Sequence, residues 1–341
     1  MLVPGRIRVG DTVAIVSPSF GAVGQFPHRT ERGLAYLESL GLRVRLMSHA
    51  AETAGWVSSA AMSRVADIHE AFSDDEVTAI VCGIGGNHSN QLLPLLDYDL
   101  IRRNPKIFQG YSDITVLHWA FAKQANLRTF YGPALVTQMA EYPNVLTFTD
   151  TFLRAAWFGE SPLEFEPATE STDEFMEWAD KADLMRPRAM KPTAGWVCVR
   201  PGVAEGWLMG GCIETLCWHV KGSDAWLDLD GAMLFLETSE EAPSPAHVDA
   251  YLVDLENLGV FEQIRGLVIG RPTGYSAEQT EQLWAVVAER TAHSGVPVLG
   301  NVDCSHTDPM LTMPMGTNVV LDAGRCLFRA LEVSTKDFLP A

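Results

Sequence analysis

The stretch that decides the fold class lies at residues 77–87 and reads VTAIVCGIGGN. Its first part, Val77 to Cys82, is almost continuously apolar or β-branched, which is typical of a strand buried on both faces. A glycine-rich turn follows, and a helical pattern begins near Ser89. A buried strand that ends in a small-residue turn before a helix is the repeating unit of an α/β sheet.

The same alternation extends outward from this stretch through the first half of the chain. We expect further strands at residues 12–16, 42–46 and 105–109, and helices at residues 29–40, 63–72 and 114–124. Strands that alternate with helices predict a parallel sheet with helices on both faces. Ligands of such open sheets bind at the carboxyl ends of the strands.

The second half of the chain has a different pattern. Residues 162–192 are crowded with acids, prolines and exposed aromatic side chains, which favours a linker that drapes over a site. Beyond it we expect a mixed sheet or partial barrel, with strands at 196–199, 233–236, 267–269, 318–322 and 325–329 and helices at 213–220, 247–258 and 277–289. We therefore predict an N-terminal α/β domain (1–160), an inter-domain linker and active-site loop (161–194) and a smaller β-rich C-terminal domain (195–341).

Composition excludes several classes of function. The 341 residues are 47% hydrophobic, enough for two domains with sizeable cores. The net charge of -18 argues against nucleic acid and against an anionic membrane surface as partners. The six cysteines form no Cys-x-x-Cys pair, and no apolar run has the length of a signal peptide or a membrane span. These features predict a soluble cytoplasmic protein with reduced thiols.

The glycine turn is the first candidate for chemistry. A dinucleotide fingerprint would require a glycine at position 88, where the chain has His88, so an oxidoreductase is disfavoured. Three interpretations stay open, namely a phosphate cradle, an oxyanion hole and a tight strand-to-helix turn.

Ser112 is the second candidate, in the segment FQGYSD at residues 108–113. A serine between a strand and a helix resembles a nucleophile elbow, and the Asp113 amide would then point toward an oxyanion. The full Gly-x-Ser-x-Gly pattern is absent because Ile114 replaces its last glycine. The alternative is that Ser112 caps the following helix.

A nucleophilic serine needs a base, and His306 is the best placed histidine. It lies in the loop DCSHTDP at residues 303–309, whereas His118 and His219 lie within helical patterns. A rival interpretation is a metal site, with ligands from Asp303, Cys304, His306 and Asp308.

The histidine in turn needs an acid that orients it. Glu237 ends the buried-type strand 233–236, and Glu240 and Glu241 follow closely. The pattern does not choose among the three glutamates. Solvated acids near a helix N-terminus are the alternative, and they suit Glu240 and Glu241 better.

Taken together, these segments resemble the L,D-carboxypeptidase family of serine peptidases, and most of all its microcin C self-immunity branch. The resemblance is carried by the stretches GDTVAIVSPS (10–19), GGNHSN (85–90), GYSDIT (110–115), GWLMGG (206–211), LFLE (234–237) and DCSHTDP (303–309).

The resemblance implies a catalytic triad of Ser112, Glu237 and His306, with an oxyanion hole made by the backbone amides of Gly86 and Asp113. It also implies a flavodoxin-like N-terminal domain, a smaller β-rich C-terminal domain that carries the glutamate and the histidine, and a cleft between them. A homodimer without metal or organic cofactor is expected.

The turn at residues 84–88 separates two branches of the family. Muropeptide-cleaving members usually have an Arg-Gly-Gly-Tyr-Gly type of turn, whereas this chain has IGGNH and is similar there to immunity-type members. By the same resemblance Trp178 stacks on a nucleobase and Gly85 contacts the substrate. Trp178 could instead be a loop aromatic that folds onto the nearest apolar surface.

The expected function is hydrolysis of an amide bond at the C-terminal residue of a peptide, or of a peptidyl or aminoacyl nucleotide. Muropeptide L,D-carboxypeptidase activity in cell-wall recycling is the alternative from the same chemistry. A non-enzymatic small-ligand binding protein is the alternative from another class.

Overall fold

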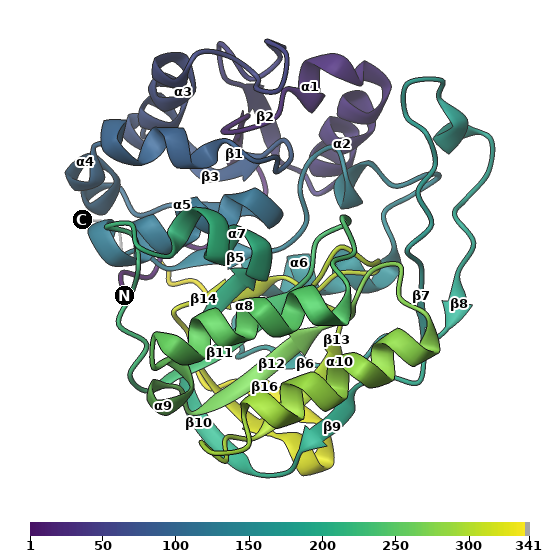
Figure 1. The fold of residues 1–341 in the computed structure, drawn as a ribbon. Helices are drawn as coiled ribbons and strands as arrows, with labels where there is room; N and C mark the ends of the chain where they lie inside the picture. Colours follow the sequence, from purple (N-terminus) through teal and green to yellow (C-terminus); the bar gives the residue numbers. More distant parts are fainter. Residues whose placement is uncertain (338–341) are drawn as a thin grey trace.

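The structure is a computed structural model that describes residues 1–337, and its first half is organised around a largely parallel sheet (Figure 1). In spatial order the six strands of this sheet within residues 1–337 are β14 (Met313–Met315), β5 (Thr129–Tyr131), β4 (Ile107–Gly110), β3 (Val77–Cys82), β1 (Thr12–Val16) and β2 (Arg43–Leu46). All neighbouring pairs are parallel except β14 with β5. The parallel strands have the flavodoxin-like order 2-1-3-4-5, as predicted.

Alternate side chains of the central strands explain why helices cover both faces of this sheet. Val13 and Ile15 of β1 pack in one apolar cluster with Leu37, while Ala14 and Val16 pack in a second cluster on the opposite face. The helices of this half are α1 (Ala22–Gln25), α2 (Pro27–Ser39), α3 (Ala61–Ser73), α4 (Tyr98–Arg103), α5 (Thr115–Ala120) and α6 (Thr147–Phe158).

The second half contains a mixed sheet, as predicted, and the sheet is open rather than a partial barrel. Its order is β6 (Glu164–Phe165), β16 (Leu327–Ala330), β15 (Asn318–Asp322), β10 (Val203–Cys212), β11 (Ala232–Glu237), β12 (Gly266–Gly270), β13 (Val298–Val302) and β9 (Val197–Arg200). The strands β10 to β13 are parallel and the outer strands are antiparallel. The helices are α7 (Ile213–Thr215), α8 (Pro245–Asn257), α9 (Val260–Gln263) and α10 (Ala277–Arg290), and α8 packs beside α10 (Figure 1).

Strand β10 is absent from the sequence prediction, although it is central to the second sheet. Its glycines weaken the strand pattern because they have no side chain to pack. The structure explains two of them. A Cβ atom on Gly210 would lie 1.8 Å from the Phe235 carbonyl oxygen, and one on Gly211 would lie 2.4 Å from Thr115 Oγ1.

These two glycines bring β10 against the helix that follows Ser112. The Trp119 indole N–H donates to the Gly210 carbonyl over 2.8 Å, and the Cys212 N–H donates to Thr115 Oγ1 over 3.1 Å. We call this contact of Gly210 and Gly211 with Thr115 and Trp119 the glycine seam. It joins the two halves of the molecule next to the candidate nucleophile.

The segment 161–194 is more structured than the expected linker. Its β6 joins the second sheet, and β7 (Glu170–Ser171) pairs with β8 (Lys191–Pro192) in a separate ribbon, visible in teal along one side of the molecule in Figure 1. The Arg188 guanidinium fastens the segment by ion pairs of 2.6 Å to both Glu141 and Asp308. The predicted boundaries at 160 and 195 remain a prediction.

Strand β14 crosses from the C-terminal half of the chain to the edge of the first sheet. In residues 1–337 no helix combines the length and the apolar composition that a membrane span requires.

Candidate active site

Ser112 lies at a sharp corner between β4 and α5, as the sequence predicts. It opens the short helical turn η2 (Ser112–Ile114), and its φ of 64° is in the left-handed region. A non-glycine residue rarely adopts this conformation, which is characteristic of nucleophile elbows. The cap position of η2 is taken by Tyr111, without a side-chain capping bond, so the capping interpretation of Ser112 finds no support.

The glycine turn lies directly against this corner. A Cβ atom on Gly85 would lie 3.1 Å from Ser112 Oγ and 3.2 Å from the Asp113 nitrogen, so only a glycine allows this approach. The Asp113 carboxylate accepts from the amides of His88 and Ser89 over 3.0 and 2.9 Å. Asp113 therefore ties the turn that contains Gly86 to the corner that contains Ser112.

His306 and Glu237 lie together in the second half. Glu237 is the last residue of β11 and only 1% exposed, and its Oε2 is 2.8 Å from His306 Nδ1. Its other oxygen accepts from the hydroxyl of buried Tyr131. The Ser112 amide donates to this same hydroxyl over 3.1 Å, so Tyr131 links the serine corner to the glutamate.

The second ring nitrogen of His306 is the one that Glu237 does not hold. Its Nε2 lies 3.1 Å from Glu240 Oε2, a distance typical of an ion pair, but it has no aligned hydrogen bond within the described chain. Ser112 and His306 line the same cavity, although no hydrogen bond joins their side chains in the part of the chain that the structure describes. Burial disfavours the charged ring, but the negative charges of Glu237 and Glu240 outweigh it and raise the pKa of His306 to about 9.

The side chains of the alternative metal site are engaged elsewhere. Asp303 accepts from the Trp196 indole over 2.9 Å and pairs with Arg271, while Asp308 pairs with Arg188. Among residues 1–337 there is no group of three or more histidine, cysteine or acidic side chains placed to hold a metal ion.

Trp178 lines the cavity that contains Ser112 and His306, which we call the Trp178 cavity; its volume is about 400 Å³. The indole packs edge-on against Phe26 at 5.3 Å between ring centroids, and the Arg29 guanidinium lies 4.2 Å above the ring. Gly85 lines the same cavity. Both predicted substrate-contacting residues thus share a space with Ser112, and Trp178 also makes the apolar contact that the alternative anticipated.

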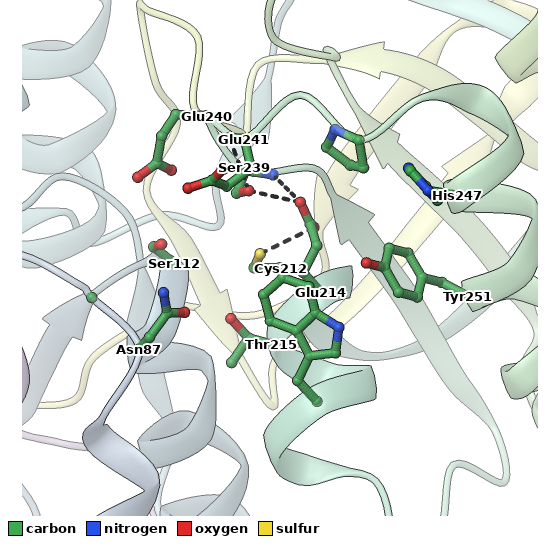
Figure 2. A pocket seen from close by; sticks show the side chains of 13 residues that line it. Asn87, Ser112, Cys212, Glu214, Thr215, Ser239, Glu240, Glu241, His247 and Tyr251 are labelled. Atoms are coloured by element: carbon green, nitrogen blue, oxygen red, sulfur yellow. Dashed lines mark hydrogen bonds between the residues drawn. The ribbon is translucent and has the colours of Figure 1, made fainter.

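A second cavity, of about 340 Å³, opens on Ser112 from the side of α7 and α8 (Figure 2). We call it the Glu214 cavity. It is lined by Glu240 and Glu241, the two glutamates weighed against Glu237, and by Glu214. Glu214 and Tyr131 are not among the predicted site residues, because Glu214 follows the unpredicted strand β10 and Tyr131 ends the equally unpredicted β5.

A serine on a strained strand-to-helix corner that shares a cavity with a histidine–glutamate pair is the arrangement of a serine hydrolase. Comparison with known proteins narrows this class. Residues 13–132 match the model of the LD-carboxypeptidase N-terminal domain, and residues 205–321 match that of the LD-carboxypeptidase C-terminal domain. The chain belongs to this family of serine peptidases.

Relatives and solved structures agree with the assignment. "Putative carboxypeptidase YocD" of Bacillus subtilis is 32% identical, over 93% of this chain and 95% of its own. The microcin C7 self-immunity protein MccF of Escherichia coli is 31% identical, over 94% and 93% of the two chains. "Probable murein peptide carboxypeptidase" of Bacillus subtilis is 29% identical, over 94% and 92%. A structure of MccF with glutamyl sulfamoyl guanosine superposes with a TM-score of 0.89 at 29% identity, over 98% of this chain and all of the other.

Proposed function

We propose that the protein is a serine carboxypeptidase-type hydrolase that cleaves an amide bond between an aminoacyl or peptidyl group and a C-terminal residue or nucleotide-like substituent. The observation that carries the proposal is the 2.8 Å hydrogen bond between His306 Nδ1 and Glu237. The imidazole ring that this bond holds lines the same cavity as Ser112. That bond fixes the orientation of the imidazole and leaves Nε2 on the cavity side.

In the proposed mechanism, Ser112 Oγ attacks the carbonyl carbon while His306 Nε2 takes the hydroxyl proton. Glu237 stabilises the imidazolium, and the amides of Gly86 and Asp113 stabilise the oxyanion of the tetrahedral intermediate. The intermediate collapses, the C–N bond breaks, and His306 returns its proton to the leaving nitrogen. Water, deprotonated by the same histidine, then hydrolyses the acyl ester on Ser112.

The relatives suggest the class of substrate. MccF has been solved with aspartyl sulfamoyl adenosine and with glutamyl sulfamoyl guanosine, in which an aminoacyl group is joined to a nucleoside. We place the nucleoside part in the Trp178 cavity, where the indole and Phe26 offer aromatic surface for a base. Gly85 supplies the close backbone approach beside Ser112.

A muropeptide is the second candidate substrate, since a relative over nearly the whole chain is named as a murein peptide carboxypeptidase. Turnover of a tetrapeptide that ends in D-Ala, compared with an aminoacyl sulfamoyl adenosine, separates the two activities. The IGGNH turn favours the nucleotide-type substrate.

The decisive test is the Ser112→Ala protein. We expect it to lose roughly 10³-fold or more in kcat while it still binds substrate, because only the nucleophile is removed. A serine-directed fluorophosphonate should label the wild-type protein at Ser112 and leave the variant unlabelled. Full turnover by the variant would exclude the mechanism, and a folded wild-type protein that neither reacts nor turns over would favour the non-enzymatic binding protein.

We also propose that the protein acts in the cytoplasm as a homodimer. Residues 1–160 and 195–341 would then be the two domains that enclose the substrate cleft, and residues 161–194 would be the linker that lies along this cleft. Sedimentation equilibrium measures the oligomeric state directly.

A further inference from the structure

The Glu214 cavity has an unusual charge for a site that would hold part of a peptide-like substrate. Three glutamates line it, Glu214, Glu240 and Glu241, and no lysine or arginine of the described chain does (Figure 2). His247 is the one basic ring on its wall, and its Nδ1 faces Ser244 Oγ at 3.3 Å. The cavity therefore presents a strongly negative surface beside Ser112.

Glu214 is the feature that points to a ligand, because it is only 2% exposed. Its Oε1 accepts from the amide and the hydroxyl of Ser239, over 3.0 and 2.7 Å, and its Oε2 accepts from the Cys212 thiol over 3.3 Å. Burial raises the pKa of Cys212 well above its usual range, so the thiol remains a neutral donor. Within residues 1–337 this carboxylate has hydrogen bonds but no positive partner, an arrangement that is costly unless a cation arrives from outside.

Two aromatic side chains, Trp218 and Tyr251, also line the cavity. Trp218 is 53% exposed and lies edge-to-face with Tyr251, with 6.3 Å between ring centroids. An ammonium or guanidinium group is attracted to the faces of such rings as well as to carboxylates. The aromatic pair is thus independent of the glutamates and indicates the same ligand chemistry.

Ser112, Gly86 and Glu240 line both the Glu214 cavity and the Trp178 cavity, so the two spaces meet at the candidate nucleophile. If the leaving group occupies the Trp178 cavity, the side chain of the acyl residue occupies the Glu214 cavity. We propose that the Glu214 cavity binds a positively charged side chain, lysine-like or arginine-like, on the acyl side of the scissile bond. This inference rests on the proposed function and adds the substrate class.

The test compares lysyl, norleucyl and glutamyl sulfamoyl adenosine as substrates of the wild-type protein. Norleucine has the carbon chain of lysine without its charge, so the lysyl compound should exceed it by at least about 10-fold in kcat/KM. The glutamyl compound should fall roughly 100-fold below the lysyl one, because its carboxylate would face Glu214. Equal rates for lysyl and norleucyl compounds, or a preference for the glutamyl compound, would overturn the inference.

Two variants assign the preference to the cavity. Glu214→Gln keeps the oxygen that accepts from Ser239 but removes the charge, and exposed Glu241→Gln removes a charge without touching a buried contact. Both variants should reduce the ratio of kcat/KM for the lysyl compound to kcat/KM for the norleucyl compound, and Glu214→Gln should reduce it by about 10-fold. Glu205→Gln, exposed on the far end of β10, is the matched control and should leave the ratio unchanged. If Glu214→Gln does not fold, an unchanged ratio in Glu241→Gln by itself contradicts the inference.

The Nα-acetyl-lysyl compound separates the side chain from the α-ammonium group. The kcat/KM of this compound should still fall when Glu214 is replaced by Gln. An equal effect of Glu214→Gln on kcat/KM for the lysyl and norleucyl compounds would mean that the α-ammonium is recognised instead. Failure of the wild-type protein to hydrolyse any of these compounds, together with absent labelling of Ser112, would count against the proposed function. Hydrolysis with the wrong charge preference would count only against the cavity assignment.

Discussion

Tyr131 is a residue whose contacts matter more than its place in the sequence suggests. Its hydroxyl donates to Glu237 and accepts from the Ser112 amide, so one side chain relates the candidate nucleophile to the candidate acid. Ser112 and His306 can be selected from the sequence, since each follows a strand in a segment that suits a catalytic group. Tyr131 cannot, because it contacts Glu237 across 106 positions of the chain and from a strand of three residues. Glu237 could be predicted in part. The end of its strand follows from the sequence pattern, but its selection as the orienting acid, in preference to Glu240 and Glu241, came from the family resemblance.

The charge of His306 leads to a prediction about pH. Because its pKa is raised to about 9, the ring is protonated at neutral pH in this structure and cannot accept a proton from Ser112. We expect kcat/KM for the norleucyl compound to rise with pH until His306 loses its proton. Glu240→Gln removes a negative charge 3.1 Å from Nε2, so the pKa of His306 should fall and the acidic limb should move to lower pH.

A pH–rate profile of each protein measures this shift. Glu278→Gln, in the first turn of α10 and away from both cavities, is the control. A limb that stays in place, or moves to higher pH, would show that Glu240 does not set the protonation of His306.

At the scale of elements, the segment 161–194 shows what composition can and cannot reveal. Its acids and prolines indicated an irregular connection, and its position over the Trp178 cavity agrees with that expectation. Its short strands were not predictable, since β6 is formed by two residues that depend on pairing with β16. Likewise the glycines of β10 hid a long strand, because their role is to admit neighbouring backbone and side chains rather than to fill a core.

Arg188 gives this segment a testable anchor. Its guanidinium pairs with Glu141 and Asp308, which are 8% and 6% exposed, so Arg188→Ala would leave two largely buried carboxylates without a partner. We expect the free energy of unfolding to fall by about 3 kcal/mol and KM to rise. Urea unfolding and steady-state kinetics measure the two effects.

Arg186→Ala is the matched control for this anchor. Within residues 1–337, Arg186 is exposed and its one ion pair is with Glu174 of its own segment, so its loss should change the free energy of unfolding by less than about 1 kcal/mol. Similar effects of the two substitutions would mean that Arg188 does not hold the segment to the rest of the molecule.

At the scale of the whole molecule, the C-terminal half contributes a strand, β14, to the sheet of the N-terminal half. The division into a parallel sheet and a mixed sheet was predictable, because strand–helix alternation stops near residue 160. The return of β14 to the first sheet was not, since Met313–Met315 is short and pairs with β5 about 180 residues earlier in the chain. Such pairing depends on tertiary structure rather than on local pattern.

The crossing of β14 predicts the behaviour of residues 1–160 alone. Without β14 the edge of β5 is unpaired, and its buried residues Thr129, Phe130 and Tyr131 lose their cover. We expect the fragment to self-associate instead of unfolding cooperatively as a monomer, because an exposed apolar edge pairs with other chains. Size-exclusion chromatography and thermal unfolding beside the full chain provide the comparison, and a monomeric fragment with a sharp transition would contradict the expectation.

The glycine seam has a consequence for how this protein could acquire new substrates. Gly211 lies directly against Thr115, and the Gly210 carbonyl accepts from Trp119, so the spacing between the halves is set by backbone atoms and not by side chains that can repack. Residues around the two cavities can vary without altering that spacing. A mutant library selected for altered substrate preference should therefore diversify at Glu214, Glu241 and Trp178 while every active member retains both glycines.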